Sequence, residues 1–499
     1  MVSAPPLLLW LAAAAAAAPT PTRRTADPRE RARMGGVFVV DAGESLRPPS
    51  KRKVHGHAGL SAAFGVVAED PAAVLEPAVA LDLRAVAPVR LGFAVPLRLR
   101  MVDRAPGDPG VLRRRDWDEV GDYFAVLRQV QYRDDVPVRA RANVHVALDA
   151  GVQRDVMLGH GSLLRGYANG LDLDRRRTGL LGAVEVSGPL LRQPAAAGLQ
   201  LLAGDVAGSQ VLGARAAARW AGAGLGVSVV GDPTAPRRLV VDGADPAAYD
   251  TTRGNRLATV GARGVVAGAL ELEYLASDRW RWSAGPYLDL DVIGSAGRGL
   301  HLGGMAEGRL GARRGARLGA TAELTVGSRG YDPAYFDAFY TTQRWSAPMF
   351  GPAGTIPTIA ASSDAAKLPW VRANVPAGVG GMGELRFEHR RGATARFEYR
   401  MRPGPLGHTA ALVVGVDVPQ VSLFARFAHR GNRHGFEPRA AGTIAQLQLR
   451  VPALRWLDVL LEAGYSFAIR RDRRGGAGGG SLPAGAGLVT AGVGGVIPW

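Results

Sequence analysis

Hydrophobic and polar residues alternate along several stretches of this chain. In residues 138–150 every second position from residue 138 onward is apolar, and Arg139 and Arg141 stand between them. The same alternation runs through residues 316–326 and 393–401. A period of two over about seven to thirteen residues is typical of half-buried β-strands, because a helix would spread the charged residues around its circumference. We therefore predict an all-β chain.

A repeated turn motif supports this prediction. The sequence Arg-Arg-Gly occupies residues 313–315 and again residues 390–392, each time between two alternating stretches. Glycine suits the third position, because such a hairpin needs a left-handed backbone there and glycine adopts it without steric cost. A three-residue turn also keeps the apolar faces of both strands on the same side. The motif predicts two hairpins with the facing pairs Ala312–Ala316 and His389–Ala393.

Short and long connections alternate from residue 316 onward. A long loop at 327–382 is followed by predicted strands at 383–389, 393–401, 409–416, 421–429, 442–451 and 456–470. Upstream candidates are Leu91–Met101, Ala125–Arg133, Val138–Ala150, Leu199–Val206, Val211–Arg219, Gly224–Gly231, Leu270–Ala276, Trp280–Val292 and Leu300–Ala312. Tight turns at one end and long loops at the other are typical of membrane barrels, with the tight turns on the periplasmic side. We predict a transmembrane antiparallel up-and-down β-barrel of roughly 16–22 strands.

The last residues of the chain alternate in the same way. Val489, Ala491, Val493, Ile497 and Trp499 fall on one side of a period-two strand. This pattern resembles the closing strand of outer-membrane β-barrels. The resemblance implies that the barrel-insertion machinery reads the strand that ends at Trp499.

The composition agrees with a membrane barrel. The chain has 67 glycines, 21% charged residues and a mean hydropathy of +0.01, as expected where lipid-facing apolar residues alternate with polar lumen residues. It has no cysteine, which excludes disulfides, a thiol nucleophile and cysteine metal ligands. No later stretch offers 18 uncharged apolar residues, so any span consists of strands.

The N-terminus has the pattern of an exported protein. Residues 5–18 form an apolar core that ends in small residues, which predicts a signal peptide over residues 1–18. A single transmembrane anchor is the alternative, but this core is short for a span of roughly 20 residues. Residues 19–55 are expected to form a periplasmic tail or the first strand, and residues 56–499 the barrel.

Arginine dominates the polar faces of the predicted strands. The chain carries a net charge of +17, and Lys occurs only at positions 51, 53 and 367. Assigning the apolar faces to lipid predicts a lumen lined by Arg139, Arg141, His145, Arg317, Arg386, Arg396, Arg400, Arg426 and Arg450. Such a surplus of positive charge biases permeation toward anions. The alternative is a closed lumen in which these residues and the acidic ones neutralise each other.

The densest polar cluster lies between residues 116 and 174. It contains Asp-Trp-Asp and then Leu-Gly-His-Gly-Ser, and its main residues are Asp116, Trp117, Asp118, His160, Gly161, Ser162, Tyr167, Asn169 and Asp172. The cluster resembles a family of Gram-negative outer-membrane, porin-like barrel proteins with D-W-D and L-G-H-G-(T/S) segments. The resemblance covers roughly residues 90–235 and implies the fold, but no chemistry.

The sequence allows three interpretations of the role of His160 and Ser162. They are a catalytic pair, a ligand contact, or a structural cluster that folds a loop into the lumen; the last is favoured, because His and Ser two residues apart are poorly placed for a triad. The acidic strings at 172–174 and 289–291 are expected to be solvated rather than to bind calcium. The aromatic stretch 331–340 is expected to fold inward as a constriction or plug, with a carbohydrate or hydrophobic ligand site as the alternative.

The predicted function is passive, porin-like diffusion of small solutes with a preference for anions. Expected partners are outer-membrane lipid and lipopolysaccharide; no nucleic acid, cofactor, metal or catalysis is expected. The alternatives are a barrel enzyme acting on lipid, a structural or adhesive barrel with a blocked lumen and, more remotely, a soluble exported β-sandwich array. Interfacial aromatic girdles are predicted at Trp280, Trp282, Tyr399, Trp456, Tyr465 and Trp499.

Overall fold

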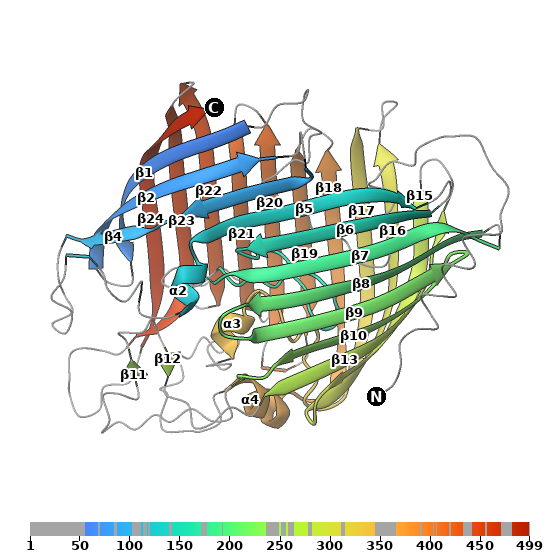
Figure 1. Cartoon of the computed structure of the whole chain (residues 1–499). Helices are drawn as coiled ribbons and strands as arrows, with labels where there is room; N and C mark the ends of the chain where they lie inside the picture. Colours follow the sequence, from blue (N-terminus) through green and yellow to red (C-terminus); the bar gives the residue numbers. More distant parts are fainter. Residues whose placement is uncertain are drawn as a thin grey trace, which may run out of the picture.

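The computed structural model shows one large antiparallel sheet that curves into a barrel (Figure 1). It describes residues 55–67, 70–83, 87–101, 111–112, 117, 120–138, 142–170, 177–191, 193–235, 249–250, 256–257, 264–277, 282–310, 315–344, 366–389, 392–402, 404–405, 407–418, 421–432, 442–454, 457–470 and 482–498. The predicted signal peptide and most of the predicted tail lie outside these residues, as do Asp116, Asp118, Arg139, Arg141, Asp172, Trp280, Trp456 and Trp499.

Most of the chain forms long strands. In the first half these are β1 His55–Val67, β2 Asp70–Asp82, β3 Val89–Ala94, β4 Leu97–Arg100, β5 Leu127–Val138, β6 Ala142–Gly151, β7 Gly179–Leu190, β8 Gln193–Asp205, β9 Gln210–Trp220, β10 Ala223–Asp232, β11 Tyr249–Asp250, β12 Arg256–Leu257, β13 Val265–Tyr274 and β14 Ala276–Ser277. The second half contains β15 Trp282–Ile293, β16 Gly297–Leu310, β17 Ala316–Gly327, β18 Gly378–His389, β19 Ala393–Met401, β20 His408–Val418, β21 Val421–Asn432, β22 Thr443–Leu454, β23 Leu457–Arg470 and β24 Leu482–Pro498. Three short helices, α2 Val120–Phe124, α3 Tyr340–Gln343 and α4 Lys367–Asn374, lie in the connections.

The pairing of the strands runs around the wall and returns to its start. β24 pairs with β23 and also with β1, where Ala58 faces Ile497 and Ala62 faces Val493. The large sheet has 22 strands, but β4 continues β3 beside β2, and β14 continues β13 beside β15, so the wall has 20 strand positions. An even number of antiparallel strands is typical of bacterial membrane barrels. The predicted fold class is confirmed, and the last strand closes the ring.

The structure corrects several predicted strand boundaries. The stretch Val138–Ala150 is not one strand: β5 ends at Val138, β6 begins at Ala142, and these two residues face each other. Val138 and Ala142 are four positions apart and therefore have the same parity, so the apolar–polar alternation does not show where β5 ends and β6 begins. Arg139 and Arg141, predicted as strand residues that line the lumen, lie between these two strands.

The repeated Arg-Arg-Gly motif behaves differently in its two copies. His389 faces Ala393 as predicted, and Gly392 has a φ of 93°. In the other copy the predicted pair is wrong, because Leu310, not Ala312, faces Ala316. The observed partner is shifted by two residues, so the same faces of the strands still coincide.

The pattern of alternation missed three strands of the barrel wall, β1, β2 and β7, and the short pair β11 and β12 outside it. The sequences of the three wall strands are rich in Ala, Gly and Pro and contain few charged residues, so the contrast between their two faces is weak. They form strands because their neighbours supply hydrogen-bonding partners, which is a property of the sheet rather than of the segment.

The two ends of the barrel differ. At one end, only two residues separate the facing pairs Leu190 and Gln193, Trp220 and Ala223, and Val418 and Val421. At the other end, long connections follow β4, β6, β10, β17 and β23. We call these the short-turn end and the long-loop end. Figure 1 shows α3 and α4 at the long-loop end, away from the C-terminus.

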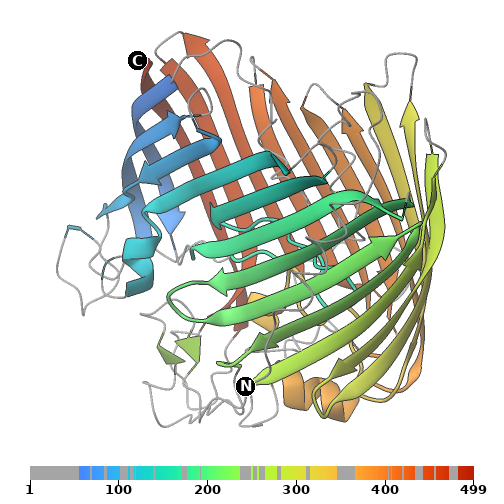
Figure 2. The ribbon, with the colours of Figure 1, turned by 45° about the vertical axis from the view of Figure 1, so that its right-hand side comes forward.

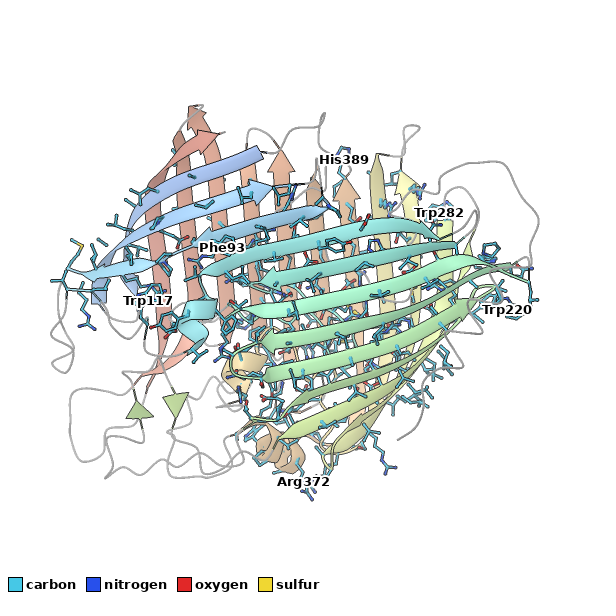
Figure 3. The ribbon with its side chains drawn as sticks, in the orientation of Figure 1. Phe93, Trp117, Trp220, Trp282, Arg372 and His389 are labelled. Atoms are coloured by element: carbon cyan, nitrogen blue, oxygen red, sulfur yellow. The ribbon has the colours of Figure 1, made fainter. Side chains whose placement is uncertain are left out.

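The outward face of the wall is apolar. Large side chains that project outward and are strongly exposed include Leu302, Leu318, Leu324, Leu385 and Phe397. A water-soluble protein would bury such a band, whereas a membrane barrel presents it to lipid. Trp220 ends β9 and Trp282 begins β15, with β10 and β13 between these strands. Both lie at the short-turn end on the right-hand side of the view (Figure 3), where they suit an interfacial girdle. Among the described residues, the helices are all too short or too polar to cross a bilayer.

Replacing a lipid-facing leucine with arginine should reveal the depth of this band. Leu385 is 55% exposed near the middle of β18. We expect Leu385→Arg to lower the free energy of unfolding by about 2–4 kcal/mol in lipid vesicles, because the charge would sit in hydrocarbon. Leu191→Arg is the matched control, since Leu191 is 78% exposed at the short-turn end, where the cost falls to about 0–1 kcal/mol. Equal effects of both variants in a urea titration would contradict this placement of the membrane.

Candidate functional site

Two connections from the long-loop end fold into the barrel. We call residues 152–170 the first lumen segment, and residues 328–344 with 366–377 the second lumen segment. Leu164, Tyr167, Phe336 and Val371 in these segments are fully or almost fully buried. The segments run between the two walls of the barrel (Figure 2). The predicted inward folding of the aromatic stretch in loop 327–382 is confirmed.

The two lumen segments are joined to each other. Ala334 N donates to Ser162 O (2.6 Å), Phe336 N donates to Leu163 O (3.0 Å), and Arg165 N donates to Phe336 O (3.2 Å). This short parallel pairing satisfies backbone groups that would otherwise be buried without partners. The segments therefore form one body inside the barrel rather than two separate loops.

His160 anchors the first lumen segment to the wall. Its Nδ1 lies 2.7 Å from Asp289 Oδ1 on β15, its Nε2 lies 3.2 Å from Glu273 Oε2 on β13, and its ring stacks on Tyr287 at 4.3 Å. Burial would lower the pKa of His160, but the hydrogen bonds to Asp289 and Glu273 outweigh it and raise the pKa to about 9. A protonated imidazole thus bridges two wall carboxylates.

The glycines on either side of His160 explain the Gly-His-Gly part of the motif. Gly159 and Gly161 have φ values of 59° and 84°, in the left-handed region that glycine adopts without strain. A Cβ at position 159 would lie 2.1 Å from Glu271 Oε1, and one at 161 would lie 2.5 Å from Arg165 Nε. The motif therefore provides close approach of the backbone to the charged wall.

Ser162 belongs to a different network from His160. Ser162 Oγ donates to Asp291 Oδ1 (3.1 Å), and Asp291 Oδ2 accepts from Tyr331 Oη (2.6 Å). Tyr331 Oη also lies 2.5 Å from His301 Nε2, and His301 is 0% exposed. A nucleophile and its base must share a hydrogen bond, and this arrangement gives Ser162 a carboxylate partner instead. The geometry therefore does not assemble the catalytic pair that we considered.

Arginines on the wall hold the other side of the first lumen segment. Asp155 accepts from Arg426 (2.9 Å) and also pairs with Arg396. In the opposite sense, Arg165 of the segment donates to Glu384 of β18 (2.8 Å). Asp155 and Arg165 thus each meet an opposite charge on the wall, as buried ions require.

A second cluster of charges holds the second lumen segment. Asp332 accepts hydrogen bonds from Arg402 (2.7 Å) and Arg430 (3.2 Å), and Lys367 Nζ lies 3.3 Å away. Burial would raise the pKa of Asp332, but the three cations lower it well below its usual value. Burial lowers the pKa of Lys367 to about 8, although Asp332 and Asp337 oppose that shift.

The remaining residues of the motif build the first lumen segment itself. Tyr167 forms a two-bond antiparallel bridge with Val156, and its side chain is fully buried. Asn169 accepts from Gln153 N and donates to Gly204 O, each at 2.7 Å. Trp117 lies apart from these contacts and packs edge-on against Tyr123 of α2. The structure gives Tyr167 and Asn169 structural contacts.

The structure places the candidate pore-lining residues as follows. His145, Arg317, Arg386, Arg396, Arg400 and Arg426 lie on inward-facing positions of their strands; Arg450 faces Ser422 in the sheet, but its side chain is outside the described part. Several are buried beneath the lumen segments: Arg400, for example, donates to Pro333 O at 3.1 Å. Their role in a pore stays a prediction.

Sequence reasoning missed Arg165, Asp332, Lys367, Arg402 and Arg430. Arg402 and Arg430 continue the even-numbered inward positions of β19 and β21, so extending the alternation past the predicted strand ends would have found them. Arg165, Asp332 and Lys367 lie on the lumen segments, outside the strands, so the alternation of apolar and polar residues could not predict their positions.

The expectation that Asp289 and Asp291 are solvated is wrong. They are 0% and 1% exposed, because they face the lumen where it is filled by the first lumen segment. Among the residues that the structure describes, His, Asp and Glu side chains form no group of three suited to a metal ion.

Comparisons with known proteins give no family assignment. Neither the scan of protein-family models nor the search of curated proteins finds a match. Solved structures with a related outline include the ferric enterobactin receptor PfeA of Pseudomonas aeruginosa (10% identity, 90% of this chain and 82% of that chain, TM-score 0.35). They also include the siderophore receptor PirA of the same organism (11%, 90% and 81%, 0.33) and its outer membrane protein OpdK (10%, 90% and 99%, 0.30). Likenesses this weak carry no argument, so the function is inferred from the chain's own residues.

Proposed function

We propose that this chain is an outer-membrane channel for small anionic solutes, narrowed by two in-folded lumen segments. The observation that carries the proposal is the lumen itself. A barrel with 20 strand positions is far too wide for wall side chains to fill, and two loops enter it from one end. Loops that narrow a polar lumen are a feature of membrane channels.

The path for the solute runs along the inward face of β3–β5. The first lumen segment is hydrogen-bonded to the wall on both sides of this face. Gln153 donates to Asp149 O on β6, and Gly170 O accepts from Gln446 on β22. Beyond these hydrogen bonds, Arg90, Arg98, Arg100 and Arg133 occupy inward positions of β3, β4 and β5. Glu76 pairs with Arg128 and Asp149 pairs with Arg133 in this sector, whereas β3 and β4 themselves carry three arginines and no acidic residue. A surplus of fixed positive charge favours anions.

The proposed location follows from the apolar outward face and the closed ring of strands. The wall faces lipid and lipopolysaccharide, β24 is the strand that the insertion machinery would read, and no catalytic step is assigned. The D-W-D and L-G-H-G-S segments, which resemble those of Gram-negative outer-membrane, porin-like barrel proteins, support the same proposal.

Conductance in planar bilayers tests this function. With a salt gradient, the refolded protein should give stable steps and a reversal potential biased toward anions. Arg98→Gln combined with Arg100→Gln should move that potential toward zero, because the fixed charge of the path falls. Arg372→Gln is the matched control, since Arg372 points away from the barrel on α4 (Figure 3). Silence from a folded protein would reject the channel in favour of a structural barrel with a blocked lumen.

A further inference from the structure

The carboxylates of Asp332 and Asp337 lie between two arginines, Arg402 and Arg430, and each arginine donates hydrogen bonds to both carboxylates. Arg402 donates from Nη1 to Asp332 (2.7 Å) and from Nη2 to Asp337 (3.3 Å). Arg430 donates from Nη2 to both oxygens of Asp332 (3.2 Å each) and from Nη1 to Asp337 (3.3 Å). Each guanidinium therefore binds both carboxylates, and such forks are how arginine recognises oxyanions.

This cluster has more positive charge than the two aspartates neutralise, and its other donors reach only neutral acceptors: Arg430 Nη1 donates to Gln343 Oε1 and Lys367 Nζ donates to Tyr335 O, each at 2.5 Å. Lys367 is the third cation beside Asp332, so three cations meet two carboxylates. Arg402 and Arg430 are 5% and 1% exposed, and among the described residues the Nε atom of each has no hydrogen-bond partner. Eight other arginines also have a buried Nε without a described partner, so the paired guanidinium groups and the third cation, rather than these atoms, suit the cluster to an anion with two carboxylates.

The cluster lies at the long-loop end of the barrel, the end from which both lumen segments enter. Arg402 directly follows the end of β19, and Arg430 lies two residues before the end of β21. Both strand ends are at the long-loop end, where α4, which carries Lys367, also lies (Figure 1). This is the outer end if the tight turns are periplasmic.

We propose that Arg402, Arg430 and Lys367 form a binding site for a small dicarboxylate. Asp332 and Asp337 occupy this site as a built-in ligand while the second lumen segment is folded inward. Binding of the solute displaces both carboxylates and frees the segment, which widens the lumen beside β19 and β21. The inference rests on the proposed anion channel, for which it supplies the class of solute and the means of opening.

A single thiol can report the release of the segment. The chain has no cysteine, so Ala338→Cys places one thiol beside Asp337, at a position that is 8% exposed. We expect succinate to speed its reaction with a charged maleimide in a saturable way, by about tenfold, as coupled binding typically does. Sodium chloride and acetate at the same ionic strength should have little effect, because neither carries two carboxylates.

Two further variants separate a binding site from a purely structural contact. Asp332→Asn weakens the built-in competitor, so the succinate concentration that gives half of the effect should fall by about tenfold. Arg402→Gln should label rapidly without succinate and no longer respond. Equal acceleration by chloride, or an unchanged half-effect concentration in Asp332→Asn, would overturn the proposal. Heat-modifiable electrophoretic mobility checks that each variant is folded.

The labelling experiment tests the binding site and the conductance experiment tests the channel, so each proposal can be rejected without the other. A succinate response in a protein without conductance would keep the site and reject the channel. Anion-selective conductance with indifferent labelling would keep the channel and reject the site.

Discussion

Replacing Asp332 with alanine is expected to release the second lumen segment from the barrel interior. The change leaves Arg402, Arg430 and Lys367 close together in a buried place with one carboxylate fewer. Breaking a buried ion pair from one side costs about 3–5 kcal/mol, because the remaining charges stay desolvated. A loss of about 3 kcal/mol corresponds to about a 100-fold increase in the open population.

Limited proteolysis measures that population when opening is fast relative to cleavage. Trypsin should cut after Arg344 and Lys367, both nearly fully buried, about 100 times faster than in the unmodified protein. Asp134→Ala serves as the control, since Asp134 contacts Tyr132 on β5 away from the segments and should change the rate little. Unchanged cleavage after Arg344 in Asp332→Ala would show that other contacts hold the segment.

His160→Ala is expected to free the first lumen segment in a comparable way. It leaves Asp289, which is 0% exposed, without the imidazole that binds its Oδ1. Asp289 Oδ2 already has no hydrogen-bond partner among the described residues, so the carboxylate would lose its only described hydrogen bond. We expect a loss of about 3 kcal/mol and faster tryptic cleavage after Arg165.

The pH dependence adds a second readout for His160. Its pKa is raised from 6.5 to about 9 in the folded state, so its contribution to anchoring is complete below pH 6.5 and is lost as the pH rises through 9. Cleavage after Arg165 should therefore accelerate over this window, and His160→Ala should remove that step. His389→Ala, at the turn that precedes β19, is the control. A flat pH profile in the unmodified protein would mean that His160 is not the anchor.

Much of the wall could be read from the chain itself. Alternation over residues 316–326 and 393–401 predicted β17 and β19 to within one residue, because each residue of a barrel strand faces either lipid or lumen. The same rule failed at residues 138–150. Val138 and Ala142 face each other and are both even-numbered, so the alternation of apolar and polar residues runs on where one strand ends and the next begins. It also missed β1 and β7, where small residues on both faces carry no contrast.

The contents of the barrel required the tertiary structure. Arg165 and Asp332 are ordinary loop residues by sequence, and their partners Glu384 and Arg402 are 219 and 70 positions away. Which charges meet is decided by how the ring of strands closes and how far each loop reaches inside.

The sequence by itself thus determined the class of fold, the faces of the strands and the positive balance of the chain, because these follow from local period and composition. The tertiary structure decided that inward arginines such as Arg396 and Arg426 bind an in-folded segment, and that His160 and Ser162 have separate partners. The physical reason is that a buried charge is stable only beside an opposite charge, and here that partner comes from a distant part of the chain.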